Sequence, residues 1–237
     1  MLQKWRAKIM DVFHGSYTKI NKIDLSKGQI NRDFGRGFYV TKIRKHAEDW
    51  AKIIGEKYET QGFVTEFVYY DTAFTERLCK VKHFEKYDEE WLDFIVLNRN
   101  PFSPTPAHDY DIVEGPVADD KVQFRLTKYL QKQIEKSAFL KELSYHEPTH
   151  QICFCTMRAL LCLDHKDKTF ALSIADISET ILSELITDKN VDDETASNIF
   201  YASKIFALLA DETKELYKKT WQEIYEMLIV ELEKNNK

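Results

Sequence analysis

The chain has few of the residues and none of the long apolar runs that mark several protein classes. Its 237 residues include four cysteines without the dense regular spacing of a disulfide scaffold, so we expect reduced, mostly buried thiols. The longest apolar runs, such as Ala159 to Leu163, are far below the roughly 18–20 residues of a membrane span. Because no secretion leader opens the sequence either, we expect a cytoplasmic protein with no membrane contact.

Several nucleotide-binding and hydrolase motifs are also missing. No G-x-x-x-x-G-K-[ST] or G-x-S-x-G occurs, and Gly35-x-Gly37 lacks the third glycine and following helix of a dinucleotide-binding Rossmann unit. The net charge of −5 gives no global electrostatic footprint for nucleic acid, although a local basic face is compatible with it. We therefore set aside P-loop, Rossmann and serine-hydrolase chemistry and do not predict nucleic-acid binding from composition.

The composition is that of an ordered globular protein, with 43% hydrophobic, 13% aromatic and 31% charged residues. Apolar runs and residue spacing predict the elements of its first part. The predicted strands are 8–13, 37–41, 63–70, 110–116 and 150–156, and the predicted helices are 45–57 and 88–98. We predict a loop able to cover a ligand over 16–33, and irregular or helical structure over 118–130. These elements predict an α+β domain over residues 1–165.

From about Lys166 onward the pattern becomes helical. Apolar residues at three- and four-residue steps predict helical blocks over 170–186, 194–210 and 213–233, the second capped at Asp192 or Asp193. Residues 166–237 thus form a helical C-terminal region. We favour a bundle that packs on the first domain over a module for docking, oligomerisation or regulatory contact.

A histidine and cysteine string near the end of the first part allows two interpretations. His146, His150, Cys153 and Cys155 are four residue types that bind zinc. However, Ile152 and Phe154 alternate with the cysteines as on a strand, which points both thiols to the same face. We favour a strand core and predict no metal.

The most informative stretch is the first fifty residues. Val12-Phe13-His14-Gly15-Ser16 is followed by a Gly-Arg-Gly-Phe-Tyr run from Gly35 to Tyr39, and Trp50 lies eleven residues beyond Tyr39. Later motifs accompany this pattern: Trp91 to Arg99, Asp109 to Asp120, and Gln151 to Phe154.

This set of motifs resembles the ADP-ribosyltransferase superfamily, in the diphtheria-toxin and poly(ADP-ribose)-polymerase branch with a His-Tyr-Glu signature. More closely, the first ~165 residues look like an uncharacterised bacterial family (DUF3990-like) that is assigned to that superfamily. The resemblance implies a split β-sheet domain, NAD as the substrate, and mono-ADP-ribosylation of a macromolecule with release of nicotinamide. The acceptor, protein or nucleic acid, stays open. Relatives with such domains are often bacterial toxins or effectors.

The resemblance also implies a role for each matched residue. His14 bonds a ribose hydroxyl, Gly15 binds the carboxamide through its backbone, and Ser16 and Gly37 complete the cofactor site. Tyr39 is one aromatic wall for the cationic nicotinamide ring, and Trp50 is either the second wall or a core residue of its helix. The catalytic residues implied are His14, Tyr39 and Gln151.

Gln151 occupies the place of the signature glutamate. A glutamine exchanges hydrogen bonds with a ribose 2′-OH but carries no charge to stabilise a developing cation. A binding module for NAD or ADP-ribose without turnover is therefore the first alternative, and an interaction protein that acts through residues 166–237 is the second.

Charged residues between positions 99 and 120 have two interpretations each. Asp109, Asp111, Asp119 and Asp120 either supply the missing carboxylate or serve turn formation and capping, which we favour. Arg99 either meets a pyrophosphate or forms a structural ion pair with Asp93 or Asp111, and we favour the ion pair.

Overall fold

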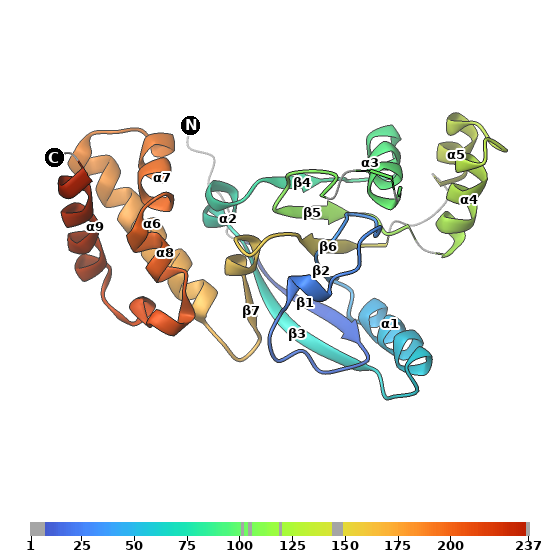
Figure 1. Ribbon diagram of the computed structural model, residues 1–237, viewed down its shortest axis with the longest axis horizontal. Coiled ribbons are helices and arrows are strands. Elements are labelled where there is room, and N and C mark those ends of the chain that lie inside the picture. Colours follow the sequence, from blue (N-terminus) through green and yellow to red (C-terminus); the bar gives the residue numbers. More distant parts are fainter. Residues whose placement is uncertain (1–7, 101, 104–105, 119, 144–148, 236–237) are drawn as a thin grey trace. The chain divides into compact units, whose positions relative to one another are not determined.

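The fold is a mixture of helices and two β-sheets (Figure 1). We describe it from a computed structural model, in which residues 8–100, 102–103, 106–118, 120–143 and 149–235 are placed. The predicted α+β class is confirmed. Among the placed residues, every helix is too short or too polar to cross a membrane.

The two sheets contain the predicted strands and two short strands that we did not predict. One sheet has the order β1-β3-β7, and the other has the order β2-β6-β5-β4, with β4 and β5 parallel and the other two pairs antiparallel. The strands are β1 (Lys8–Ser16), β2 (Phe38–Val40), β3 (Phe63–Asp71), β4 (Val81–His83), β5 (Ile112–Gly115), β6 (Gln151–Phe154) and β7 (Leu163–His165). A bridge between Phe13 and Thr41 joins β1 to the residue after β2. β1 is longer than predicted, so His14 lies within it.

The two helices predicted in the first part are found as α1 (Arg44–Lys57) and α3 (Glu89–Arg99), each within one residue of its predicted ends, among further helices. The other helices up to residue 143 are α2 (Ala73–Leu78), α4 (Asp120–Leu130) and α5 (Lys136–Leu143), of which α2 and α5 were not predicted. The Asp88 carboxylate caps α3 by accepting the N–H of Trp91 at 2.9 Å, which satisfies one free donor of the first turn. The stretch left open between irregular and helical structure is helical in α4.

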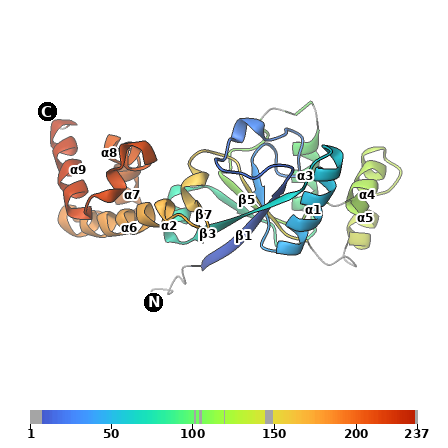
Figure 2. The same ribbon diagram turned by 90° about the horizontal axis from the view of Figure 1, so that it is seen from below.

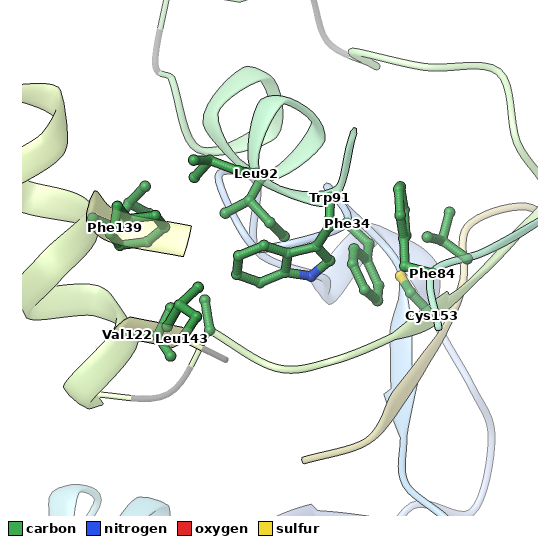
Figure 3. Close-up of a cluster of buried hydrophobic side chains, with 12 residues drawn as sticks. Phe34, Phe84, Trp91, Leu92, Val122, Phe139, Leu143 and Cys153 are labelled. Carbon is green, nitrogen blue, oxygen red and sulfur yellow. The ribbon is translucent and has the colours of Figure 1, made fainter. Parts of the chain in front are cut away.

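An aromatic core packs α3, α4 and α5 against one face of the β2-β6-β5-β4 sheet. Figure 3 shows Trp91 of α3 near its centre, with Phe139 of α5 on one side and Phe34 and Cys153 on the other. The Trp91 indole is fully buried and donates its Nε1–H to a backbone carbonyl at 3.1 Å. Burying a ring of this size with its polar atom satisfied contributes several kcal/mol, on the order of 3–5 when the side chain is lost.

The chain divides into two compact units that interleave along the sequence. Of the described residues, one unit contains 8–11, 67–79 and 158–235, and the other contains 12–66 and those that lie within 80–157. Strands β1 and β3 contribute residues to both. The predicted division near residue 165 stays a prediction about domain organisation.

The first C-terminal helix begins at Phe170, as predicted, but ends at Lys189 instead of residue 186, and the later helices differ more from the predicted blocks (Figure 2). They are α6 (Phe170–Lys189), α7 (Asp193–Tyr201), α8 (Lys204–Leu209) and α9 (Trp221–Asn235). The block predicted as 194–210 is two helices, because the Ser203 hydroxyl accepts the N–H of Phe206 at 2.9 Å and caps a new helix there. Asp192, one of the two predicted caps, does cap α7.

The last predicted block, 213–233, starts too early. Its first residues form two 3₁₀ turns, η3 (Glu212–Lys214) and η4 (Leu216–Lys218), before α9 starts at Trp221. Glu215 has a φ of 53°, a left-handed conformation that cannot continue a right-handed helix.

Candidate functional site

His14 is held at the junction of β1 and β2. Its Nδ1 lies 2.7 Å from the carbonyl oxygen of Tyr39, and its ring stacks on Phe38 with 4.4 Å between centroids. Burial lowers the pKa of the imidazole, although the hydrogen bond to Tyr39 opposes the shift. Because a carbonyl accepts only, we assign the proton of the neutral ring to Nδ1, which leaves Nε2 with a lone pair.

Gly15 has a packing reason to be glycine. A Cβ at this position would lie 2.2 Å from the carbonyl oxygen of Ala47 and 3.0 Å from the backbone nitrogen of Ala51. Only a residue without a side chain lets α1 approach β1 this closely. Ser16 follows as the last residue of β1.

The structure does not bring the side chains of His14 and Tyr39 to one face. Successive residues of a strand point to opposite faces, so Tyr39 points away from Phe38, on which His14 stacks. The Tyr39 hydroxyl donates to the carbonyl of Gly35 at 2.7 Å and accepts the N–H of Phe34 at 3.0 Å. Burial raises its pKa well above the usual value.

Gly37, the second glycine of the Gly-x-Gly run, is also fixed by packing. A Cβ there would lie 2.4 Å from Sγ of Cys153 and 2.7 Å from the carbonyl oxygen of Phe154. The close pairing of β2 with β6 therefore requires glycine at this position.

Trp50 is a surface residue and not the core residue of the alternative interpretation. Its side chain is 43% exposed, and the guanidinium of Arg32 lies 5.7 Å from the ring centroid. The buried face of α1 is made instead by Ala47, Ala51 and Gly55. An exposed indole that already holds a cation presents a π-face to ligands.

Gln151 faces a buried ion pair. Its Nε2 donates to Oδ2 of Asp33 at 2.8 Å and to the Pro116 carbonyl at 3.3 Å. The Asp33 carboxylate accepts from Nε of Arg99 at 2.7 Å and from the N–H of Ala118 at 2.8 Å. The side-chain Nε2 of Gln151 thereby links the start of β6 to Asp33, which precedes the Gly-x-Gly run, and to Pro116, which follows β5.

Arg99 forms a structural ion pair, as we favoured, but its partner is Asp33 and not Asp93 or Asp111. Asp111 instead accepts the backbone N–H of Lys80 at 2.8 Å and the hydroxyl of Thr156 at 2.6 Å, and Asp109 pairs with Lys80. These contacts give both carboxylates a structural role, but they join them to residues far away in the sequence and are not the turn formation or capping that we favoured. Asp119 and the side chain of Asp120 lie outside the described part of the chain.

Cys153 and Cys155 point to the same face, as predicted, and pack in the aromatic core with 3.5 Å between their sulfurs. His146 of the proposed zinc string lies outside the described residues. In the part of the chain that is placed, no three His, Cys, Asp or Glu side chains are arranged to hold a metal ion.

A charged cluster around Glu114 was missed at the sequence level. Its carboxylate accepts from Nε2 of His150 at 2.8 Å, lies 3.4 Å from Nδ1 of His83, and forms an ion pair with Lys42. Burial opposes ionisation, but these three donors together hold the pKa of Glu114 well below its usual range. The cluster borders a pocket of about 590 Å³.

Only the strand register brings this cluster together. His83 stands opposite Glu114 on paired strands, while Lys42 and His150 flank β2 and β6. The four residues are spread over more than a hundred positions of sequence, and nothing in their spacing indicates a shared site.

The protein is thus a mixed α+β protein in which Gly15 packs the His14 strand tightly against α1. An exposed indole, Trp50, lies on α1, and a charged cluster surrounds Glu114 on the other sheet. The chain belongs to the DUF3990 family, described as a protein of unknown function, whose model matches residues 10–165. That range runs from β1 to β7. No curated protein and no solved structure matches the chain.

Proposed function

We propose that this chain is an ADP-ribosyltransferase-like protein that binds NAD beside His14 and transfers one ADP-ribosyl group to a macromolecule. The observation that supports this most directly is the state of His14. Its Nδ1–H is committed to the Tyr39 carbonyl and its ring is neutral, so Nε2 is an acceptor for a ribose hydroxyl. This is the role that the sequence resemblance implies for it.

Gly15 supports the same proposal through its rigidity. Binding a carboxamide by backbone N–H and C=O requires a strand that does not shift when the ligand arrives. The contact of Gly15 with the backbone of Ala47 and Ala51 fixes this strand against α1.

The two proposed aromatic walls differ in whether their rings are accessible to a nicotinamide ring. Trp50 already attracts the Arg32 guanidinium, and a cationic nicotinamide ring would replace it by the same attraction, worth about 0.5–2 kcal/mol. Tyr39 lies on the face opposite to the one where His14 stacks, and its hydroxyl is bound to the Phe34–Gly35 backbone, so it does not line a site beside His14 as placed. In this proposal Trp50 is the wall that is available, and Tyr39 becomes a wall only if β2 and residues 33–37 rearrange when NAD binds.

In the proposed reaction the bond between nicotinamide and its ribose breaks, and nicotinamide leaves with the bonding electron pair. The acceptor's nucleophilic atom then bonds to the anomeric carbon and loses its proton to solvent or a nearby base. The sugar passes through an oxocarbenium-like state, which a carboxylate would stabilise. Gln151 brings no charge to that state.

A second candidate is favoured by Gln151 itself. Its amide nitrogen is bound to Asp33 and Pro116 and the residue is 9% exposed, so the signature position has no carboxylate and its side-chain donor is already in use. A module that binds NAD or ADP-ribose without transfer fits this observation.

Calorimetry with NAD, run beside an assay for released nicotinamide and transfer of labelled ADP-ribose to lysate, tests both candidates. We expect His14→Ala to abolish NAD binding, and the matched imidazole deletion His83→Ala to leave it unchanged. Binding with label transfer supports the transferase, and binding without nicotinamide release supports the module. Absence of NAD binding in the wild type, or binding that survives His14→Ala, overturns both.

A further inference from the structure

The segment between β1 and β2 is strongly basic in a chain of negative net charge. Residues 17–36 contain five basic residues and two acidic ones, in a protein with a net charge of −5. The basic residues are Lys19, Lys22, Lys27, Arg32 and Arg36. The segment therefore carries a local positive charge that the whole-chain balance hides.

The two acidic residues of this segment offset only part of its positive charge. Asp33 is buried and paired with Arg99. Asp24 caps η1 (Leu25–Lys27) by accepting the N–H of Ser26 at 3.0 Å and keeps a charge that interacts with Lys22 and Lys27, so it offsets part of the positive charge but leaves an excess of cations. Lys19, Lys22 and Lys27 are exposed, and within the described residues none of them lies at ion-pair distance from a carboxylate. These lysines are available to an anionic partner.

Two aromatic contacts join this segment to α1. Tyr17 stacks on Tyr58 with 4.3 Å between ring centroids, and Arg32 lies over Trp50. The three aromatic side chains are 43–49% exposed. Since Trp50 and Tyr58 are eight residues apart along α1 and its C-cap, they stand about 12 Å from each other along the helix axis. We call this surface, made by residues 17–36 with Trp50 and Tyr58, the loop–helix face.

The acidic residues of α1 leave the basic part of the face intact. Glu48 and Asp49 are paired with Arg44 and Lys45 of the same helix. Glu56 and Glu59 lie beside Tyr58 and reduce the positive potential at that end. Anionic groups of a partner are therefore expected on the lysines of residues 19–27.

Exposed aromatic rings interleaved with unpaired cations are what single-stranded nucleic acids bind. Lysine and arginine neutralise phosphates, and each base that stacks on an aromatic ring contributes about 1–3 kcal/mol. A duplex keeps its bases stacked inside and offers these rings no partner. We propose that the loop–helix face binds single-stranded nucleic acid.

This inference stands without the proposed NAD chemistry, because the binding needs neither NAD nor transfer. It identifies the kind of macromolecule that the face would bring to the chain. Measurements made without NAD keep the outcomes of the two proposals separate.

The test is fluorescence anisotropy of a labelled single-stranded oligothymidylate, about twenty nucleotides long, with the full chain at about 50 to 200 mM salt. We expect binding that weakens with salt. The logarithm of the binding constant should fall linearly with the logarithm of the salt concentration, with a slope of about −0.7 for each phosphate contacted. Replacing Lys19, Lys22 and Lys27 together by Glu should weaken binding at least tenfold and flatten that slope. Tyr17→Ala should weaken it about fivefold or more while leaving the slope unchanged.

Matched variants elsewhere check that the effects are local. Phe124→Ala removes an exposed aromatic on α4 that also carries a lysine, with Nζ of Lys128 4.5 Å from its ring centroid. Replacing Lys214, Lys218 and Lys219 by Glu makes the same charge change at the 3₁₀ turns η3 and η4 of the C-terminal region. Both should bind the oligonucleotide as the wild type does, and circular dichroism of every variant checks that it is folded.

Several results would overturn the proposal. These are no binding by the wild type at about 10 µM and low salt, equal losses in the matched variants, or duplex binding as tight as single-strand binding. Preferential binding to vesicles of anionic lipid or to an acidic peptide would assign the face to another partner and would also refute it.

Discussion

Restoring the signature glutamate at position 151 is expected to destabilise the protein. Nε2 of Gln151 lies 2.8 Å from Oδ2 of Asp33, so Gln151→Glu places two carboxylates about 3 Å apart in a site that is almost closed to solvent. Two like charges at that distance repel by about 5.5 kcal/mol at an effective dielectric constant of about 20. Arg99 on the other side of Asp33 offsets part of this, and we expect a net loss of about 2–4 kcal/mol.

The loss should depend on pH with a definite sign. Beside a like charge, the new carboxyl has a raised pKa, so the destabilisation is complete above that pKa. It is relieved as the pH falls through the raised pKa, where the folded pair takes up a proton, and it is gone below the ordinary carboxyl value of about 4.3. Urea unfolding at about pH 7.5 and about pH 5 measures this. With an m-value of about 2.5 kcal/mol/M, the midpoint should fall by about 0.8–1.6 M at the higher pH and by less than half of that at the lower.

A neutral variant separates charge from lost contacts. Gln151→Met keeps the side-chain volume and removes the donor to Asp33, at a cost of about 1.5–3 kcal/mol that is the same at both pH values. The reasoning fails if Gln151→Glu matches the wild type at about pH 7.5, or if its deficit does not change with pH. A stable Gln151→Glu variant that releases nicotinamide from NAD would show that position 151 is open to substrate.

Three further outcomes are expected. Gly37→Ala should lower the unfolding free energy by about 1–3 kcal/mol in urea, because its Cβ meets Sγ of Cys153 at 2.4 Å; an unchanged midpoint would contradict this. Glu114→Gln should lower the unfolding free energy near neutral pH, because the depressed pKa of Glu114 in the folded protein adds stability at every pH above its pKa in the unfolded chain. The difference from wild type should shrink only below about pH 4.3, and unfolding midpoints across a pH series check it. Ser203→Ala should cost about 1 kcal/mol by removing the cap that accepts the N–H of Phe206, and faster amide exchange confined to the start of α8 would locate the loss there.

Local pattern was enough to predict most elements, because each depends on short-range spacing. Alternation and apolar runs predicted the strands at 63–70 and 150–156, and the acidic start predicted the helix after Asp88. The break at Ser203 was missed because apolar periodicity continues through it, while a single cap decides where the backbone turns. β4 and β7 have three residues each, too few to show a period, and pairing with neighbouring strands alone makes them strands.

The candidate site divides in the same way. The sequence by itself determined the family motifs, the α+β class and the residues of the His14 strand, since these are properties of local order along the chain. The tertiary structure alone decided that Tyr39 faces the core, that Gln151 is bound to Asp33, and that Glu114 collects three cationic or imidazole partners. Those outcomes depend on strand register and on burial. A shift of the register by one residue moves every side chain of a strand to the opposite face. The spacing of residues in a single sequence shows neither the register nor the burial.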